Sequence, residues 1–155
     1  MKKLSITEVF DKAIKLEEAA YKFYVDIANI VEDDASKYTL NFLAEEELKH
    51  KKILQKYKSG GFSEGSLALD TVVDGKIVEA FGVPEIKKGM AHKDIFLVAA
   101  EKEKASHEFY EGLAHMHPEG ELKNLFLKFA NEELKHKEKV EYLYCNAAFP
   151  QTAGG

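Results

Sequence analysis

The chain has 155 residues, of which 45% are hydrophobic, and its formal net charge is −5. This length and this apolar content suit one compact domain with a buried core, so we expect a single domain. The acidic balance argues against binding to nucleic acid or to anionic membranes. No apolar run is long enough to cross a bilayer, and the polar N-terminus does not resemble a secretory signal, so we expect a cytoplasmic protein.

Cysteine occurs once, at Cys145. A single cysteine excludes an internal disulfide and any Cys-x-x-Cys site for zinc, thiol redox chemistry or rubredoxin-type iron. We expect Cys145 to pack as a small hydrophobic side chain. We also expect no haem and no flavin.

Four stretches have the composition of long helices, at about residues 5–32, 36–58, 93–116 and 119–145. Short breaks separate the first pair near Asp33 and Asp34, and the last pair near Pro118. Short turns predict antiparallel neighbours, so each pair is expected to form a helix hairpin. Between the hairpins lies a glycine-rich crossover, about residues 59–92, whose own structure the sequence leaves open. The predicted fold is therefore an all-α four-helix bundle, built from two antiparallel hairpins joined by a long crossover.

Each predicted helix carries a stripe of apolar residues spaced by alternating threes and fours, which is typical of a helix facing a bundle core. Every stripe is interrupted near its middle by ionisable residues. These interrupting residues are Glu17 in the first helix, Glu47 and His50 in the second, Glu103 in the third, and Glu133 and His136 in the fourth.

A charged, solvated helix face is the simplest interpretation of the segments EEELKHKK and NEELKHKE. The spacing argues against it, because neighbouring charges such as Glu45, Glu46 and Lys49 fall off the apolar stripe while Glu47 and His50 fall on it. A buried carboxylate without a compensating charge costs several kcal/mol. Four such carboxylates in one core therefore predict a cation between them.

The two hairpins also repeat each other. LEEAAYKFY at 16–24 matches KEKASHEFY at 102–110, and the two Glu-x-x-His segments match at the same offset of 86 residues, as between Glu17 and Glu103. Counted from the two short turns, the six stripe residues lie within about one helical turn of the same level. The repeat therefore predicts two copies of one half-site.

A Glu from each of two helices and a Glu-x-x-His from each of the other two is the donor set of ferritin-like di-iron bundles. The chain resembles that superfamily, and in particular its rubrerythrin-like branch, whose first helices are similar to the pattern from Glu17 to Tyr24. The resemblance implies two iron ions, bridged by Glu47 and Glu133 and capped by Glu17 and Glu103. Carboxylate and imidazole ligands also suit Mn²⁺ and Zn²⁺, so the choice of iron rests on the resemblance.

The chain departs from the rubrerythrin pattern in ways that bear on function. The missing Cys-x-x-Cys pairs imply that electrons come from a separate donor, such as a rubredoxin-like protein. The third helix has Ser106 where these relatives commonly offer a further ligand carboxylate, and this puts the peroxidase chemistry in more doubt than the metal site. The short tail is a poor match for the extra helix of cage-forming ferritins, which disfavours a storage shell.

Three further residues lie near the predicted site. Tyr24 and Tyr110 sit two turns beyond Glu17 and Glu103, where each either hydrogen-bonds a ligand carboxylate or packs as a core aromatic residue. His107 is one turn from Glu103 and is either an additional ligand or a hydrogen-bonded core histidine.

Three functions fit this sequence. The first is an oxidoreductase of oxidative-stress type that reduces hydrogen peroxide or dioxygen at the metal pair. The second is an iron-binding ferroxidase or metal-handling protein without peroxidase turnover, and the third is an interaction bundle whose site no longer works. We also expect a homodimer formed through outer helix faces, with Phe23, Phe109 and Phe149 as candidate contacts.

Overall fold

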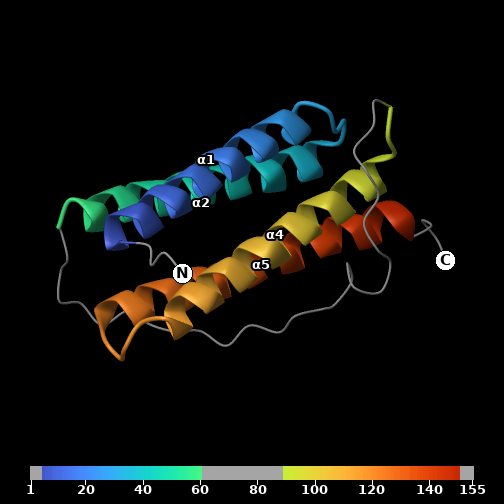
Figure 1. Cartoon of the computed structure of the whole chain (residues 1–155). Helices are drawn as coiled ribbons and strands as arrows, with labels where there is room; N and C mark the ends of the chain where they lie inside the picture. Colours follow the sequence, from blue (N-terminus) through green and yellow to red (C-terminus); the bar gives the residue numbers. More distant parts are fainter. Residues whose placement is uncertain (1–4, 61–88, 151–155) are drawn as a thin grey trace. The chain divides into compact units, whose positions relative to one another are not determined.

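The structure of the chain is a computed structural model, and the residues that it describes are 5–60 and 89–150. Within these residues the structure contains helices and no strand. The helices are α1 (Ile6–Ala28), α2 (Asp34–Lys58), α4 (His92–His115) and α5 (Glu121–Ala148) (Figure 1). All four predicted helices are therefore present. The predicted crossover lies mostly outside the described residues, as does the end of the tail.

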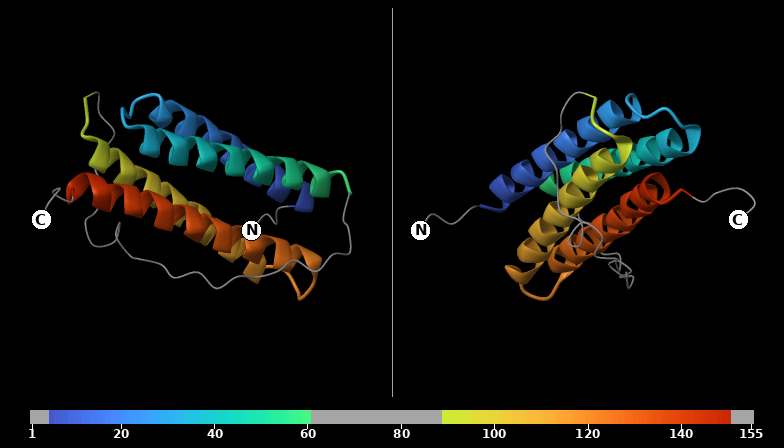
Figure 2. Two further views of the ribbon diagram at one scale, coloured as in Figure 1. Left: turned by 180° about the vertical axis from the view of Figure 1, so that it is seen from behind. Right: turned by 90° about the vertical axis from the view of Figure 1, so that its right-hand side faces the viewer.

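The helices form two hairpins. The chain divides into two compact units, Met1–Gly65 and Ser66–Gly155, and we describe each by itself. In the first unit α1 packs against α2, and in the second α4 packs against α5. The further views confirm that the helices of each pair lie side by side and run in opposite directions (Figure 2). The two predicted antiparallel hairpins are confirmed, and the expectation of a single domain stays a prediction.

Side-chain caps define where the first two helices begin. Ser5 precedes α1, and its hydroxyl accepts a hydrogen bond of 3.2 Å from the backbone N–H of Glu8. Asp33 precedes α2, and its carboxylate accepts one of 2.8 Å from the N–H of Ser36. Each cap satisfies one of the N–H groups that a helix start leaves without an intrahelical acceptor.

The first helix is shorter than predicted, because α1 ends at Ala28 instead of near residue 32. Lys37, in the first turns of α2, donates a 3.0 Å hydrogen bond from Nζ to the carbonyl oxygen of Ala28. A lysine at this place satisfies a carbonyl group that the end of the helix leaves open. Val31 is nevertheless buried, so the connection between the helices contributes to the core of the first unit.

The other helix ends also follow local chemistry. Beyond α2, Gly60 has a φ of 86°, and its N–H donates to the carbonyl of Tyr57, a left-handed ending that glycine adopts without steric cost. After α4, Nδ1 of His117 lies 2.7 Å from the carbonyl oxygen of Leu113. The fourth helix begins at Glu121, after Pro118 and Gly120, and runs three residues further than predicted.

Most residues of the predicted apolar stripes are buried, although Ile14, Tyr21 and Leu122 are only half-buried. In the first unit the fully buried side chains include Phe10, Leu40, Leu43 and Leu54. In the second unit Tyr110 contacts the rings of Phe126 and Phe129, with centroid separations of 6.4 Å and 5.3 Å. These layers of large side chains lie within a few turns of the ionisable residues in each hairpin, and they fix the helices that carry them.

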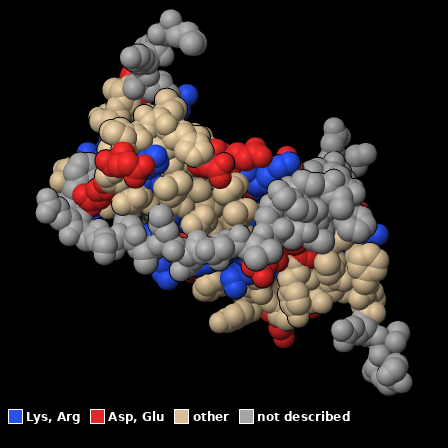
Figure 3. Space-filling view, turned by 90° about the horizontal axis from the view of Figure 1, so that it is seen from below, with Lys and Arg blue, Asp and Glu red and all other residues tan. Residues whose placement is uncertain are grey.

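On the face drawn in Figure 3, acidic and basic side chains lie interspersed among the described residues, and neither sign forms a large patch. None of the described helices is long and apolar enough to span a membrane.

Candidate metal centre

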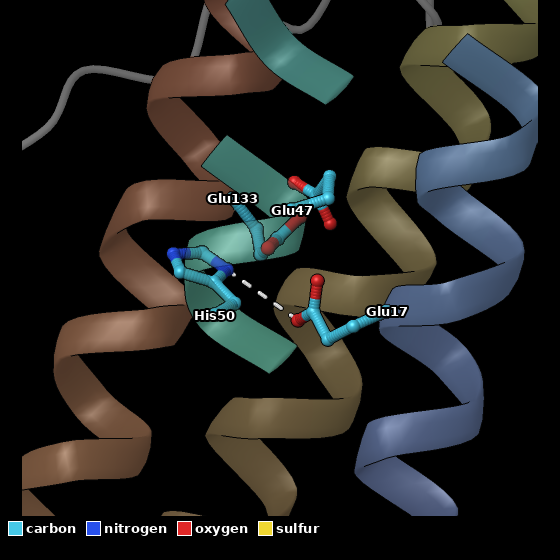
Figure 4. A group of neighbouring side chains, drawn as sticks. All are labelled: Glu17, Glu47, His50 and Glu133. Atoms are coloured by element: carbon cyan, nitrogen blue, oxygen red, sulfur yellow. Dashed lines mark ion pairs between the residues drawn. The ribbon is translucent and has the colours of Figure 1, made fainter. Parts of the chain in front are cut away.

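The first hairpin brings three predicted ligands together. Glu17 comes from α1, and Glu47 and His50 come from one turn of α2. Each offers a donor atom, and these atoms lie within 4.8 Å of one another. Nδ1 of His50 lies 3.4 Å from Oε1 of Glu17 (Figure 4). We call Glu17, Glu47 and His50 the first triad.

The second hairpin repeats this arrangement. Glu103 comes from α4, Glu133 and His136 come from one turn of α5, and their donor atoms also lie within 4.8 Å of one another. Nδ1 of His136 lies 3.6 Å from Oε1 of Glu103 and 3.8 Å from Oε2 of Glu133. We call these residues the second triad. In both triads the same ring nitrogen faces the carboxylate of the neighbouring helix, so the repeat seen in the sequence extends to side-chain geometry.

All six triad residues are buried, and none is more than 4% exposed. By contrast, the charges predicted to lie off the stripe are at least partly accessible, with Glu45 and Lys49 exposed and Glu46 half-buried. The ion pair between Lys49 and Glu46 spans 3.4 Å at the surface of α2. The triads are therefore core residues and not part of a solvated charged face.

The chemistry of each triad fits one divalent cation. A metal bound by imidazole nitrogen and carboxylate oxygen at about 2.1 Å holds donor atoms no more than about 4.2 Å apart. The His–Glu separations of 3.4 Å and 3.6 Å fall inside this limit. Two carboxylates supply a charge of −2 and a neutral imidazole adds none, which one divalent cation balances. The donor set is suited to iron, manganese or zinc.

The two candidate tyrosines are among the most deeply buried side chains of the protein, with Tyr24 1% and Tyr110 0% exposed. Each contacts the ring of the preceding phenylalanine, Phe23 or Phe109, at centroid separations of 5.5 Å and 5.2 Å. These contacts show that both tyrosines pack against aromatic side chains. A hydrogen bond from either hydroxyl to a ligand carboxylate stays a prediction.

His107 has partners for both ring nitrogens within its own hairpin. Nδ1 lies 2.8 Å from the carbonyl oxygen of Ala130 on α5, and Nε2 lies 3.2 Å from Oε2 of Glu111, one turn further along α4. This geometry favours the hydrogen-bonded histidine over the additional ligand, because a nitrogen engaged with a protein partner is not free to bind metal. His107 connects α4 to α5.

We expect His107→Phe to destabilise the second hairpin without changing the metal stoichiometry. The substitution removes the hydrogen bond to the carbonyl oxygen of Ala130, which should lower the free energy of unfolding by about 1 kcal/mol. Urea unfolding of the variant measures this loss, and metal titration of the folded variant measures the stoichiometry. If the fully folded variant binds less metal than the wild type, His107 is a metal ligand.

One buried pair was not anticipated from the sequence. Lys137, the residue after His136, is fully buried, and its Nζ donates to Oε2 of Glu141 at 3.0 Å. In the first hairpin the equivalent positions are Lys51, which pairs at 3.3 Å with Glu18, and Gln55. Lys51 is partly exposed, so the two hairpins differ here.

Comparison with known proteins agrees with this geometry. The family model described as Rubrerythrin matches residues 5–91, which include α1, α2 and the first triad. A solved structure of a hypothetical protein from Pyrococcus furiosus is similar, with 28% sequence identity and a TM-score of 0.72 over 96% of this chain and 94% of that one. No curated protein matches the chain.

The family match covers more than half of the chain and confirms the predicted ferritin-like, all-α fold class. A buried carboxylate and histidine cluster compatible with a metal site is thus found in a fold where such clusters are expected. On these grounds the chain belongs to the rubrerythrin family.

Proposed function

We propose that the two triads together hold two iron ions, and that the protein is a di-iron oxidoreductase that reduces hydrogen peroxide or dioxygen. The observation that carries this proposal is the duplicated triad. Each hairpin buries two carboxylates and one imidazole with donor atoms within 4.8 Å, and each triad has the charge that one divalent cation balances.

Each triad would hold the metal through three side chains. Glu17 and Glu103 would each bind through a carboxylate, and His50 and His136 through an imidazole nitrogen. Glu47 and Glu133 have two carboxylate oxygens each and would act as the remaining carboxylate ligands. When bound, two ferrous ions supply the two electrons that, with two protons, reduce one hydrogen peroxide to two waters.

The apolar side chains around the triads limit the access of water. Leu43 and Leu54 lie within one to two turns of the first triad, and Phe129 and Val140 lie similarly close to the second; all four are fully buried. A dry surrounding strengthens the electrostatic interactions between ligands and cations and keeps reactive oxygen species from bulk solvent.

Electrons for turnover come from a separate protein under this proposal. The only cysteine of the chain is Cys145, so the chain has no Cys-x-x-Cys pair to hold rubredoxin-type iron of its own. A rubredoxin-like donor is the partner that we propose.

A ferroxidase or metal-handling role is the second candidate, and Ser106 favours it. This residue is buried on α4, one turn beyond Glu103, where a further carboxylate would complete a larger ligand set. A site with fewer carboxylates holds its iron less tightly and releases it more readily. Iron uptake beyond two ions per chain, or rapid transfer to a chelator, would support this role, while a fixed stoichiometry of two would argue against storage.

Stopped-flow mixing of the Fe(II)-loaded protein with hydrogen peroxide tests the leading proposal. We expect oxidation much faster than that of free Fe(II), and recovery of the ferrous form on adding a reductant. Glu47→Gln removes one ligand charge and should lower the rate by more than about 100-fold, because losing a group that only orients a metal ligand already costs about 10–100-fold.

Glu46→Gln is the matched control for this experiment. It makes the same chemical change one residue away on α2, outside the triad, where Glu46 forms only a surface ion pair with Lys49. Such pairs contribute little to stability. Equal rates in the two variants, or a wild-type rate no faster than that of free iron, would exclude a peroxide-reducing triad site.

A further inference from the structure

His107 ties the two helices of the second hairpin together beside the second triad. It lies on α4 one turn beyond Glu103, and its Nδ1 donates a 2.8 Å hydrogen bond to the backbone carbonyl oxygen of Ala130 on α5. Ala130 in turn lies one turn before Glu133. Since α4 and α5 run in opposite directions, both residues are displaced from the triad toward the same end of the hairpin. The hydrogen bond therefore joins the helices about one turn away from the ligands.

The ring of His107 is held at its other edge as well. Nε2 lies 3.2 Å from Oε2 of Glu111, which is one turn further along α4. The His107 side chain is 17% exposed and Ala130 is 1% exposed, so water competes little for the bond between them. A hydrogen bond in such surroundings is stronger than one at the surface. We call His107, Glu111 and the carbonyl group of Ala130 the clamp.

The first hairpin has other residues at these places. At the offset of 86 residues, His107 corresponds to the half-buried Tyr21, and Glu111 corresponds to Val25. A tyrosine carries its only polar side-chain atom at the far end of the ring, and a valine side chain has none. Neither residue can reproduce the clamp, so the repeat of the two hairpins breaks down at this point.

Near the first triad the two helices are joined by a weaker kind of contact. Nζ of Lys51 lies 3.3 Å from Oε1 of Glu18, with side chains that are 28% and 51% exposed. Ion pairs this accessible contribute little to stability and are screened by salt. The helices of the second hairpin are therefore held more firmly beside their ligands than the helices of the first.

In other respects the two triads are alike. Both consist of two carboxylates and one imidazole, whose Nδ1 lies 3.4 Å from the carboxylate of the neighbouring helix in the first triad and 3.6 Å in the second. Ligands that are already held in place lose less conformational freedom when a metal binds, which raises the affinity. We propose that His107 is a positioning residue that makes the second triad the tighter of the two metal sites, so that this triad fills first. The inference rests on the metal binding of the proposed function and not on the reduction of peroxide.

Anaerobic titration of the metal-free chain with Fe(II), followed by isothermal titration calorimetry, tests the order of filling. We expect two binding steps whose dissociation constants differ by about tenfold or more, the lower end of what a group that supports a metal ligand contributes. Glu103→Gln should remove the tighter step, and Glu17→Gln should remove the weaker one.

Two substitutions of His107 separate its two contacts. The amide nitrogen of asparagine takes the place of Nδ1, whereas that of glutamine takes the place of Nε2. His107→Asn therefore keeps the donor to Ala130, and His107→Gln keeps only the contact with Glu111. We expect His107→Gln to weaken the tighter step by about tenfold and His107→Asn to leave it nearly unchanged, with the same number of ions bound in both variants.

The choice of these variants separates positioning from general stability. Glutamine is a better helix former than asparagine, so a purely structural role would make His107→Asn the weaker binder. Circular dichroism and urea unfolding of the metal-free variants establish that both are folded under the titration conditions. Tyr21→Phe, at the matching position of the first hairpin, is the control and should leave both steps unchanged.

Three results would overturn the assignment of His107 while leaving the proposed metal pair intact. These are two steps of equal affinity in the wild type, loss of the weaker step in Glu103→Gln, and a His107→Asn variant that binds no more tightly than His107→Gln. A wild-type chain that binds no Fe(II) would contradict both this assignment and the proposed function.

Discussion

Each bound Fe(II) ion is expected to raise the free energy of unfolding by about 3 kcal/mol when the free metal is at roughly 100 times its dissociation constant. For a chain of this size, each ion then adds roughly 5–11 °C to the melting temperature. The physical reason lies in the triads, where each of two buried carboxylate pairs is held close together. A cation between them relieves their repulsion in the folded state and has little comparable affinity for the unfolded chain.

Differential scanning calorimetry of the metal-free and Fe(II)-loaded protein under anaerobic conditions measures this shift.

The doubly substituted variant Glu47→Gln/Glu133→Gln should differ from the wild type in both forms. Its metal-free form should be more stable than the wild type, because each triad loses one of two neighbouring negative charges, and added Fe(II) should change its melting temperature little. Equal melting temperatures for the two wild-type forms would support an interaction bundle with a site that no longer works.

Tyr110→Ala is expected to cost about 3–5 kcal/mol of stability, the range for truncating a large aromatic side chain in a core. Tyr110 is fully buried and contacts the rings of Phe109, Phe126 and Phe129, so its removal opens a cavity between α4 and α5. Urea unfolding of the metal-free protein measures the loss. A cost below about 1 kcal/mol would mean that the surrounding rings collapse into the space.

Tyr110→Phe separates packing from hydrogen bonding, because it keeps the ring and removes only the hydroxyl. If the hydroxyl supports a ligand carboxylate, the variant should bind iron about 10–100-fold more weakly while losing little stability. If the tyrosine acts only by packing, iron affinity should be unchanged. Tyr24→Phe makes the same comparison in the first hairpin.

Helix positions and the triads could be predicted from the sequence because both depend on periodicity. The spacing of threes and fours placed Glu47 and His50 on the same stripe as Leu43 and Leu54, and all four are buried. The duplication made this prediction stronger, since the equivalent residues of the second hairpin, including Glu133 and His136, are buried as well.

Details that depend on a single tertiary contact could not be predicted. The end of α1 at Ala28 involves a hydrogen bond from Lys37 of the next helix, which no pattern within residues 5–32 indicates. Likewise the two partners of His107 come from its own helix and from the backbone of α5, and a backbone acceptor has no signature in the sequence. Periodicity places a residue on a face, but it does not identify the atom that the residue meets there.

The buried pair of Lys137 and Glu141 constrains how this sequence can change over evolutionary time. Changing either residue alone removes one partner of a buried ion pair, which typically costs about 3–5 kcal/mol, whereas replacing both by apolar residues is often neutral or favourable. An apolar pair at these two positions is therefore hard to reach by single substitutions, because each singly substituted intermediate is less stable than the present protein. In a randomised library selected for folding, positions 137 and 141 should covary, while Lys51 and Gln55 of the first hairpin should drift independently.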